Sequence, residues 1–120
     1  MFLELGHTKL KVFEVVQDII EECYSIVSKL PSDERFNLIQ QIKRAAISIK
    51  LNLAEGSSRR SGIERKRYYE IARGSLIEID TAIGVCINLK LIPIEYVQKL
   101  GQLIVHCYGM LTGIINNPGK

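Results

Sequence analysis

Residues 51–75 read LNLAEGSSRRSGIERKRYYEIARGS, and this stretch contains the joint between two predicted helices. Gly56 is expected to close the first helix in a left-handed conformation, as glycine often does after a last helical turn. Ser61 and Glu64 stand three residues apart, which is the spacing of a capping box and predicts the start of a second helix. The stretch therefore predicts two helices joined by a short turn.

Apolar residues recur at about the helical period on both sides of this joint, which predicts amphipathic helices throughout the chain. The first segment covers about residues 8–30, and the second begins after Pro31, where Ser32 is expected to cap its free amides. The third runs from the joint to about Leu91 and is the longest, and the fourth starts at Pro93 and ends near Asn116. Four helices with short connections predict an all-α fold, an antiparallel up-down four-helix bundle, over residues 1–120 as a single domain.

The expected core is one apolar stripe from each of the first two helices. Three widely spaced cysteines form no disulfide framework and are expected to pack as small apolar residues. Gly74 and Gly84 weaken the third helix by roughly 1 kcal/mol each, which close helix contact is expected to offset. The residues predicted to point inward are Val12, Phe13, Val16, Ile19, Ile20, Cys23, Ile26, Val27 and Leu30, then Leu38, Ile42, Ala45, Ala46, Ile49 and Leu53.

The end of the third helix and most of the fourth carry more apolar residues than one buried stripe needs. Only a narrow ridge of the fourth helix is polar, with Glu95, Gln98, Gln102 and His106. Apolar surface on two sides predicts an interface between subunits. The alternative is a fourth helix that the monomer itself encloses.

Charge is concentrated in one part of the chain. Between Lys43 and Arg73 there are nine basic and three acidic residues, a net charge of +6, and the whole chain carries +3, so the rest carries −3. No apolar run approaches the roughly 18 residues of a membrane span. The first residues lack the order of a signal peptide, so we expect a cytoplasmic protein with no membrane partner.

Residues 57–67, which we call the basic turn, hold most of this positive charge. Cations at the start of a helix oppose the helix dipole, so stability alone favours acids there. Free amides and serine hydroxyls at a helix start suit an anion, and arginine suits phosphate. Tyr68 or Tyr69 could stack on a base. The predicted nucleic-acid contacts of the basic turn are Arg59, Arg60, Arg65, Lys66 and Arg67.

A purely structural interpretation of the basic turn stays open. Its arginines could be solvated or pair with nearby glutamates, and Tyr69 shares a face with core residues. Glu55 sits in a last helical turn, where negative charge is disfavoured, so we expect Arg60 or Arg73 to pair with it. Glu78 and Asp80 either join a buried or interfacial ion pair or face water.

No catalytic constellation is evident. His7 lies in the N-terminal segment, and His106 is adjacent to Cys107, so their side chains diverge by about 100° on a helix. No histidine or cysteine pair has metal-site spacing, and no nucleotide-binding or hydrolase motif occurs. A ribonuclease would need His106 beside an arginine or lysine across an interface. We therefore predict no enzyme activity, no metal and no cofactor.

Specific blocks of the sequence resemble one bacterial family. They include Glu34-Arg35, Arg44-Ala45-Ala46, the NLAEG of residues 52–56, Arg60, and the ARGSL of residues 72–76, with Glu78 and Asp80-Thr81 following. This pattern resembles the four-helix bundle proteins first noted as reading frames in intervening sequences of large-subunit ribosomal RNA genes. The similarity covers nearly the whole chain, with Asp80, Tyr69 and Lys50 as small departures.

The resemblance implies an antiparallel bundle that assembles into a ring of about five subunits and has no assigned enzyme activity. One related branch, the accessory variability proteins of diversity-generating retroelements, binds nucleic acid and a reverse transcriptase through a basic pentameric barrel. Carried over to this chain, it implies surface contacts at the basic turn, with Lys43, Arg44 and Lys50 of the neighbouring helix as further candidates. It also implies structural roles for Glu55, Arg73 and Glu78. We expect RNA or DNA as partner, and the alternative is a scaffold that docks an acidic or reverse-transcriptase-like protein.

Overall fold

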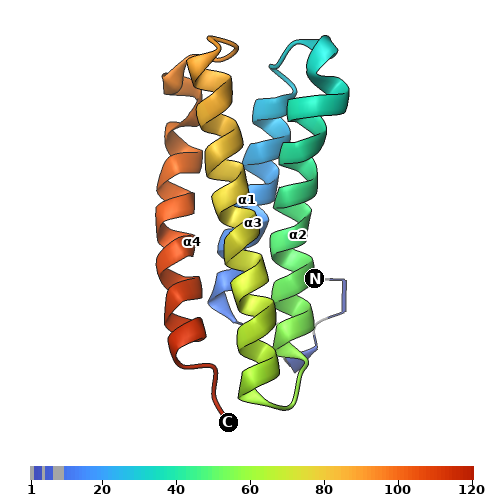
Figure 1. Ribbon diagram of the computed structural model, residues 1–120, viewed down its shortest axis with the longest axis vertical. Helices are drawn as coiled ribbons and strands as arrows, with labels where there is room; N and C mark the ends of the chain where they lie inside the picture. The colour runs from blue at the N-terminus through green and yellow to red at the C-terminus, as the bar shows by residue number, and fades with distance from the viewer. Residues whose placement is uncertain (1, 4, 7–9) are drawn as a thin grey trace.

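The computed structural model describes residues 2–3, 5–6 and 10–120. Its four α-helices run alternately up and down and form an elongated bundle measuring 46 × 27 × 22 Å (Figure 1). No strand occurs in the described part of the chain, so the predicted all-α four-helix bundle is confirmed. The helices are α1 (Lys11–Val27), α2 (Gln40–Ser57), α3 (Gly62–Asn88) and α4 (Gln98–Asn116).

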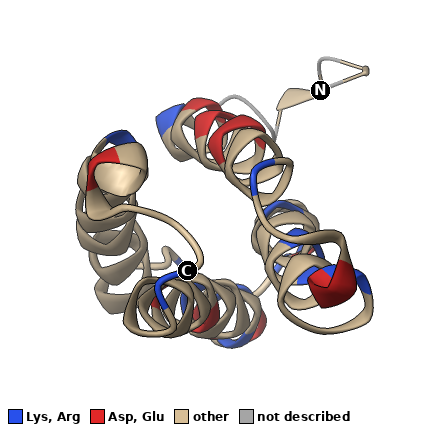
Figure 2. Cartoon of the chain, turned by 90° about the horizontal axis from the view of Figure 1, so that it is seen from above, with Lys and Arg blue, Asp and Glu red and all other residues tan. Residues whose placement is uncertain are grey.

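Each helix packs against the next one in the chain, and α4 returns to pack against α1. Seen along the bundle axis, the four helices surround a common centre (Figure 2). The pair α2 and α3 makes the most extensive contact. The α1–α2 edge of the bundle therefore lies opposite the α3–α4 edge.

The predicted apolar stripes form the core. Every residue expected to point inward from the first two helices is buried, including Ile19, Ile42 and Leu53 with no exposed surface. Cys23, Cys86 and Cys107 are free thiols buried in the same core, which confirms that they pack as apolar residues. Burial of such side chains contributes about 1.5–3 kcal/mol each.

The connection between α1 and α2 differs from the prediction. The expected start of the first helix at Thr8 lies outside the described residues, and the helix ends at Val27. Ser32 does not cap a helix, because it opens a short 3-10 turn, Ser32–Glu34, whose preceding residue makes no side-chain cap hydrogen bond. A π-helical turn, Arg35–Ile39, then leads into α2 and buries Leu38. Two irregular turns thus replace the single capped helix start.

Gly56 has a different role from the one predicted. It lies inside α2 in a right-handed conformation, and Gly119 is the one glycine with positive φ in the described chain. A Cβ atom on Gly56 would lie 2.8 Å from Cβ of Tyr68 and 3.0 Å from Cε1 of Tyr69. Glycine is therefore needed because α3 approaches the backbone of α2 closely.

The glycines of α3 behave in the opposite way. No atom lies within 4 Å of a Cβ placed on Gly74 or Gly84, so the close contact predicted for them is absent within the described chain. The helix ends at Asn88, slightly before the predicted Leu91. Pro93 precedes a 3-10 turn, Ile94–Val97, which leads into α4.

The surplus apolar residues of α3 and α4 stay on the surface. Val105 is 75% exposed, Leu89 60% and Ile94 53%. The bundle therefore does not enclose its fourth helix, and the alternative of a fully covered α4 is wrong for the single chain. An apolar surface remains along the α3–α4 edge.

Candidate nucleic-acid interface

The basic turn joins α2 to α3 at the end of the bundle where the chain also terminates (Figure 1). Arg59 and Arg60 lie in the turn itself, and Arg65, Lys66 and Arg67 lie in the first two turns of α3, as predicted. Ser61 caps α3 by accepting a hydrogen bond from the Glu64 amide at 3.1 Å. The predicted capping residue is thus confirmed, and it fixes where the turn ends.

Arg59 is held by its own neighbours. Its Nη2 atom donates to the hydroxyl oxygen of Tyr68 at 3.0 Å and lies 3.5 Å from a carboxylate oxygen of Glu55. The guanidinium carbon stands 5.0 Å from the centre of the Tyr68 ring, within range for a cation–π interaction. Arg59 therefore ties α2 to α3 through Nη2, while its Nε atom is buried without a hydrogen-bond partner among the described residues.

Arg65 is likewise engaged inside the chain. Its Nη1 atom donates to the carbonyls of Arg59 and Arg60 at 2.9 and 2.8 Å. Its Nε atom donates to the carbonyl of Pro118 at 2.7 Å, which joins α3 to the segment that follows α4. Sequence reasoning missed this contact, because nothing in the local pattern links two positions 53 residues apart.

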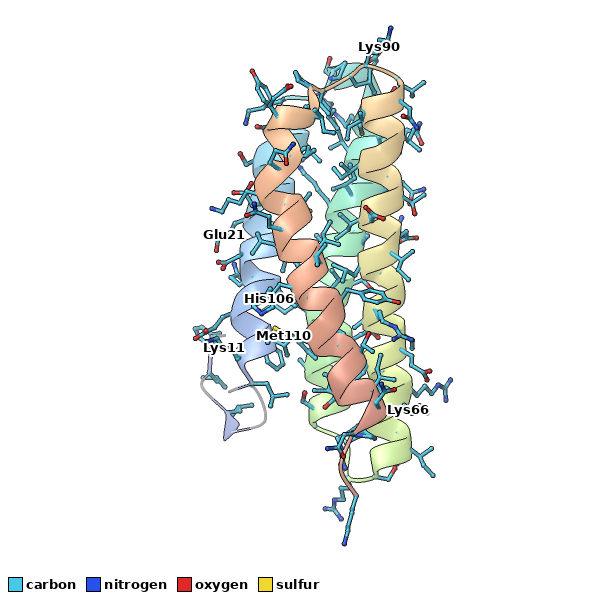
Figure 3. All side chains as sticks on the ribbon, turned by 90° about the vertical axis from the view of Figure 1, so that its left-hand side faces the viewer. Lys11, Glu21, Lys66, Lys90, His106 and Met110 are labelled. Atoms are coloured by element: carbon cyan, nitrogen blue, oxygen red, sulfur yellow. The ribbon has the colours of Figure 1, made fainter. Side chains whose placement is uncertain are left out.

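Arg60, Lys66 and Arg67 are different. All three are exposed, and none of their side chains makes a hydrogen bond, an ion pair or a ring contact with any residue that the structure describes. Figure 3 shows Lys66 pointing away from the bundle near the end that carries the basic turn, with Lys90 at the opposite end. Of the five cations predicted in the turn, these three are free to meet a partner.

The anion site expected at the start of α3 is largely occupied by groups of the chain itself. Ser61 takes the Glu64 amide, and the Gly62 amide donates to the carbonyl of Lys120 at 3.3 Å. The hydroxyl of Ser58 donates to the Glu55 carbonyl at 2.8 Å, and that of Ser57 lies 3.3 Å from the Tyr69 hydroxyl. The prediction of free hydroxyls is therefore wrong, and among the amides of residues 62–65 only that of Ile63 has no partner within the described chain.

The two tyrosines beside the turn offer no open face of the predicted kind. Tyr69 is 4% exposed and belongs to the core, which confirms the structural interpretation of this residue. Tyr68 is half-buried and has Arg59 over its ring. Base stacking on either ring would need the surrounding contacts to open.

A comparison with models of protein families identifies the family of the chain. The family model described as "23S rRNA-intervening sequence protein" matches residues 8–113. The chain belongs to this family. No curated protein matches the sequence closely enough to count as a relative. The resemblance drawn from the NLAEG and ARGSL blocks is thereby confirmed.

In this member of the intervening-sequence family, the basic residues of α2 lie apart from the basic turn. Arg44 is 13 residues before the end of α2, which corresponds to about 20 Å along the helix. Lys43 lies over the ring of Tyr24 at 5.1 Å, and Lys50 donates to the side chain of Gln17. Lys43 and Lys50 thus contact α1, whereas Arg44 is exposed, and the eight predicted contacts do not form one surface.

The residues with predicted structural roles have partners other than those expected. Glu55 pairs with Arg59 rather than with Arg60 or Arg73. Arg73 donates to the Thr112 hydroxyl at 3.1 Å and lies 5.5 Å from the ring centre of Tyr108, so it links α3 to α4. Glu78 and Asp80 are both exposed and have no ion pair within the described residues.

The structure adds three facts about chemistry. His106 is exposed on α4 and Cys107 is buried, so their side chains diverge as predicted, while His7 lies outside the described residues (Figure 3). Among the described residues, no cluster of histidine, cysteine, aspartate or glutamate side chains could hold a metal ion. Within the same part of the chain, no helix has the length and apolarity to cross a membrane.

Burial also changes the pKa of the three cysteine thiols. It raises the pKa of Cys23 and of Cys107 to about 12, and it raises the pKa of Cys86 as well, with a smaller contribution from Glu34. A thiol with a raised pKa is a poor nucleophile at neutral pH. The cysteines therefore belong to the core and not to a reactive site.

Proposed function

We propose that this protein is a non-catalytic, self-associating helical bundle that binds the phosphate backbone of RNA or DNA through Arg60, Lys66 and Arg67. The observation that carries the proposal is the free state of these three cations on one exposed turn. Their position at a helix start costs a few tenths of a kcal/mol each, since they oppose the dipole. A phosphate partner explains why the chain keeps cations there.

The charge distribution supports a polyanion partner. The free cations lie at one end of the bundle, whereas α1 carries Glu14, Asp18, Glu21 and Glu22 along its length. A charged surface of one sign steers an oppositely charged ligand to one part of a protein. Three phosphate contacts give weak, salt-sensitive and sequence-independent binding.

Self-association is the second part of the proposal, and the α3–α4 edge supports it. A groove of about 620 Å³ runs along this edge, floored by apolar side chains and bordered by Asp80. Gly84 and Gly101 face it without side chains, one from each helix. An apolar groove between two helices accepts a further helix or apolar face.

The opposite edge of the bundle offers a complementary surface. Leu51 is 64% exposed beside Tyr24, Ile47 and Arg44, which line a shallow hollow between α1 and α2. Contact between two different faces of identical chains is heterologous and closes into a ring when the rotation permits. We propose that the α1–α2 edge of one copy meets the α3–α4 edge of the next, and that the ring has about the five subunits that the family resemblance implies.

Charge favours this pairing. Arg44 stands about 20 Å, and Asp80 about 27 Å, from the end that carries the basic turn, counted along α2 and α3 at the helical rise. Parallel neighbours therefore bring these two charges to within about 7 Å of each other along the bundle axis. The same arrangement gathers every basic turn at one end, so that each copy adds three free cations to a common field.

The proposal is tested by measuring the affinity of fluorescent single-stranded RNA and of duplex DNA at low salt. Replacing Arg60, Lys66 and Arg67 with glutamine should weaken binding at least tenfold, since about three phosphate contacts are lost. The matched control replaces Lys29, Arg35 and Lys90, which lie at the other end, and removes the same charge. An equal loss of affinity in both variants would mean that only the net charge of the protein matters. It would contradict binding by a specific surface.

The alternative of a docking scaffold gives a different result. A scaffold that meets an acidic protein through the basic turn would hold no RNA or DNA at low salt. Capture of an acidic protein free of nucleic acid, with the capture lost in the variant of Arg60, Lys66 and Arg67, would favour it. The free cations support both, but the shared positive end favours the repeating charge of a nucleic acid.

A further inference from the structure

The segment after α4 folds back onto the basic turn. Residues 117–120, which we call the strap, lie beside the start of α3, with the Gly62 amide donating to the carbonyl of Lys120 and Nε of Arg65 donating to the carbonyl of Pro118. Nη2 of Arg65 would lie 3.2 Å from a Cβ atom on Gly119, so it also faces the strap. The edge of Arg65 formed by Nε and Nη2 is therefore covered.

This covered edge is the part of the Arg65 guanidinium that is suited to bind a phosphate. Nη1 of Arg65 is taken by two carbonyls of the turn, which leaves Nε and Nη2 as the pair able to grip two oxygens side by side. Hydrogen bonds between two charged groups are roughly twice as strong as those between neutral groups. A phosphate oxygen is thus a better acceptor for this edge than the neutral carbonyl of Pro118.

Two glycines allow the strap to sit so close. A Cβ atom on Gly62 would lie 2.1 Å from the carbonyl oxygen of Gly119, so any side chain at residue 62 must displace the strap. Gly119 has a φ of +82°, a conformation that side-chain-bearing residues rarely adopt. The contact can therefore be broken from either side by adding one methyl group.

We propose that the strap is an autoinhibitory contact that withholds Arg65 from nucleic acid. The inference rests on the proposed function of the basic turn and adds its regulation. With the strap closed, each chain offers three cations, Arg60, Lys66 and Arg67. With the strap displaced, Arg65 becomes a fourth phosphate contact and the Gly62 amide becomes a further donor beside it.

The test uses Gly62→Ala, which displaces the strap and places a good helix former in the first turn of α3. Gly74→Ala is the matched control, because it adds the same methyl group to the same helix with no atom within 4 Å. Gly119→Ala breaks the contact from the other side and covers the case in which Gly62→Ala fails to fold. Amide hydrogen exchange at residue 62, whose amide donates to the Lys120 carbonyl, verifies that the strap has moved.

Binding of a fluorescent single-stranded RNA is then followed as a function of salt. One further phosphate contact steepens the plot of log affinity against log salt by about 0.7, which corresponds to about fivefold tighter binding at 0.1 M salt. We expect this gain in Gly62→Ala and in Gly119→Ala, its absence in Gly74→Ala, and its loss when Arg65→Gln is added to Gly62→Ala.

Two outcomes would overturn the proposal that the strap withholds Arg65 from nucleic acid. If exchange shows that it has moved and the affinity and slope equal those of the unaltered protein, Arg65 is not withheld, while the proposed function stands as long as Arg60, Lys66 and Arg67 are still needed. If neither the unaltered protein nor the strap variants bind RNA at low salt, both the strap and the proposed function fail. Binding seen only in the strap variants supports the strap most strongly.

Discussion

Gly56 of α2 lies so close to Tyr68 of α3 that a single added Cβ atom would stand 2.8 Å from the tyrosine Cβ. Contacts this short with a rigid, helix-borne side chain force the two helices apart. Overpacking of this kind typically costs about 1–3 kcal/mol. The basic turn directly follows this contact, so the approach of the two helices also fixes where its cations lie.

Gly56→Ala should therefore lower the free energy of unfolding by about 1–3 kcal/mol, although alanine is the better helix former. Urea denaturation followed by circular dichroism measures the change. Gly74→Ala serves as the control and should be neutral or stabilising, by up to about 1 kcal/mol, because its methyl group meets nothing. Equal stabilisation by both substitutions would contradict the close approach of α3 to Gly56.

Arg59→Gln should separate structure from binding. The substitution removes the contacts of Arg59 with Glu55 and Tyr68, which are partly exposed, and should lower the free energy of unfolding by about 1 kcal/mol. Affinity for RNA should stay within about twofold, because one charge lost from a contact already satisfied removes little. Arg60→Gln is the matched comparison and should do the reverse, weakening RNA binding while leaving stability unchanged.

Self-association predicts a mass well above the 13.6 kDa of one chain. Val105→Asp places a charge on the rim of the α3–α4 groove, at a residue 75% exposed, and should reduce the mass measured by light scattering to that of a monomer. Ile63→Asp is the control, since Ile63 is 86% exposed but lies on the basic turn, away from both edges. A monomeric unaltered protein, or equal effects of the two substitutions, would remove the proposed interface.

The periodic part of the sequence was sufficient to predict the fold. Apolar spacing identified four helices and the inward stripes of the first two, because burial of one helix face is a local, repeating property. The capping residue Ser61 was also correct, since a cap depends on residues within one turn. The prediction for Gly56 was wrong because glycine favours both helix ends and close helix contacts, and only the position of Tyr68 decides between them.

The site was less predictable than the fold. The sequence identified the basic turn but could not distinguish Arg60, which is free, from Arg65, which contacts Pro118 far along the chain. It also assigned Glu55 to the wrong arginine, although Arg59 stands four residues after Glu55, which is the spacing at which opposite charges pair on a helix. Partners set by tertiary contact leave no trace in local spacing.

The raised pKa of the buried thiols predicts a pH dependence of stability. Above about pH 8.5 the unfolded chain loses its thiol protons, whereas Cys23 and Cys107 keep theirs in the folded state up to about pH 12. The folded state then binds more protons, so the free energy of unfolding falls as pH rises, by about 1.4 kcal/mol per pH unit for each such cysteine. Cys107→Ala should make the fall of the unfolding free energy between pH 9 and 11 shallower by the contribution of one cysteine, about 1.4 kcal/mol per pH unit. Identical slopes would contradict the burial of this thiol.

The most direct test of the central claim is the salt dependence of RNA binding. Each phosphate contact on a single strand contributes about 0.7 to the slope of log affinity against log salt. Glutamine at Arg60, Lys66 and Arg67 should reduce that slope by about 2 for each chain in contact, while glutamine at Lys29, Arg35 and Lys90 should leave it unchanged. A slope that is the same in both variants would show that the free cations of the basic turn do not bind the nucleic acid.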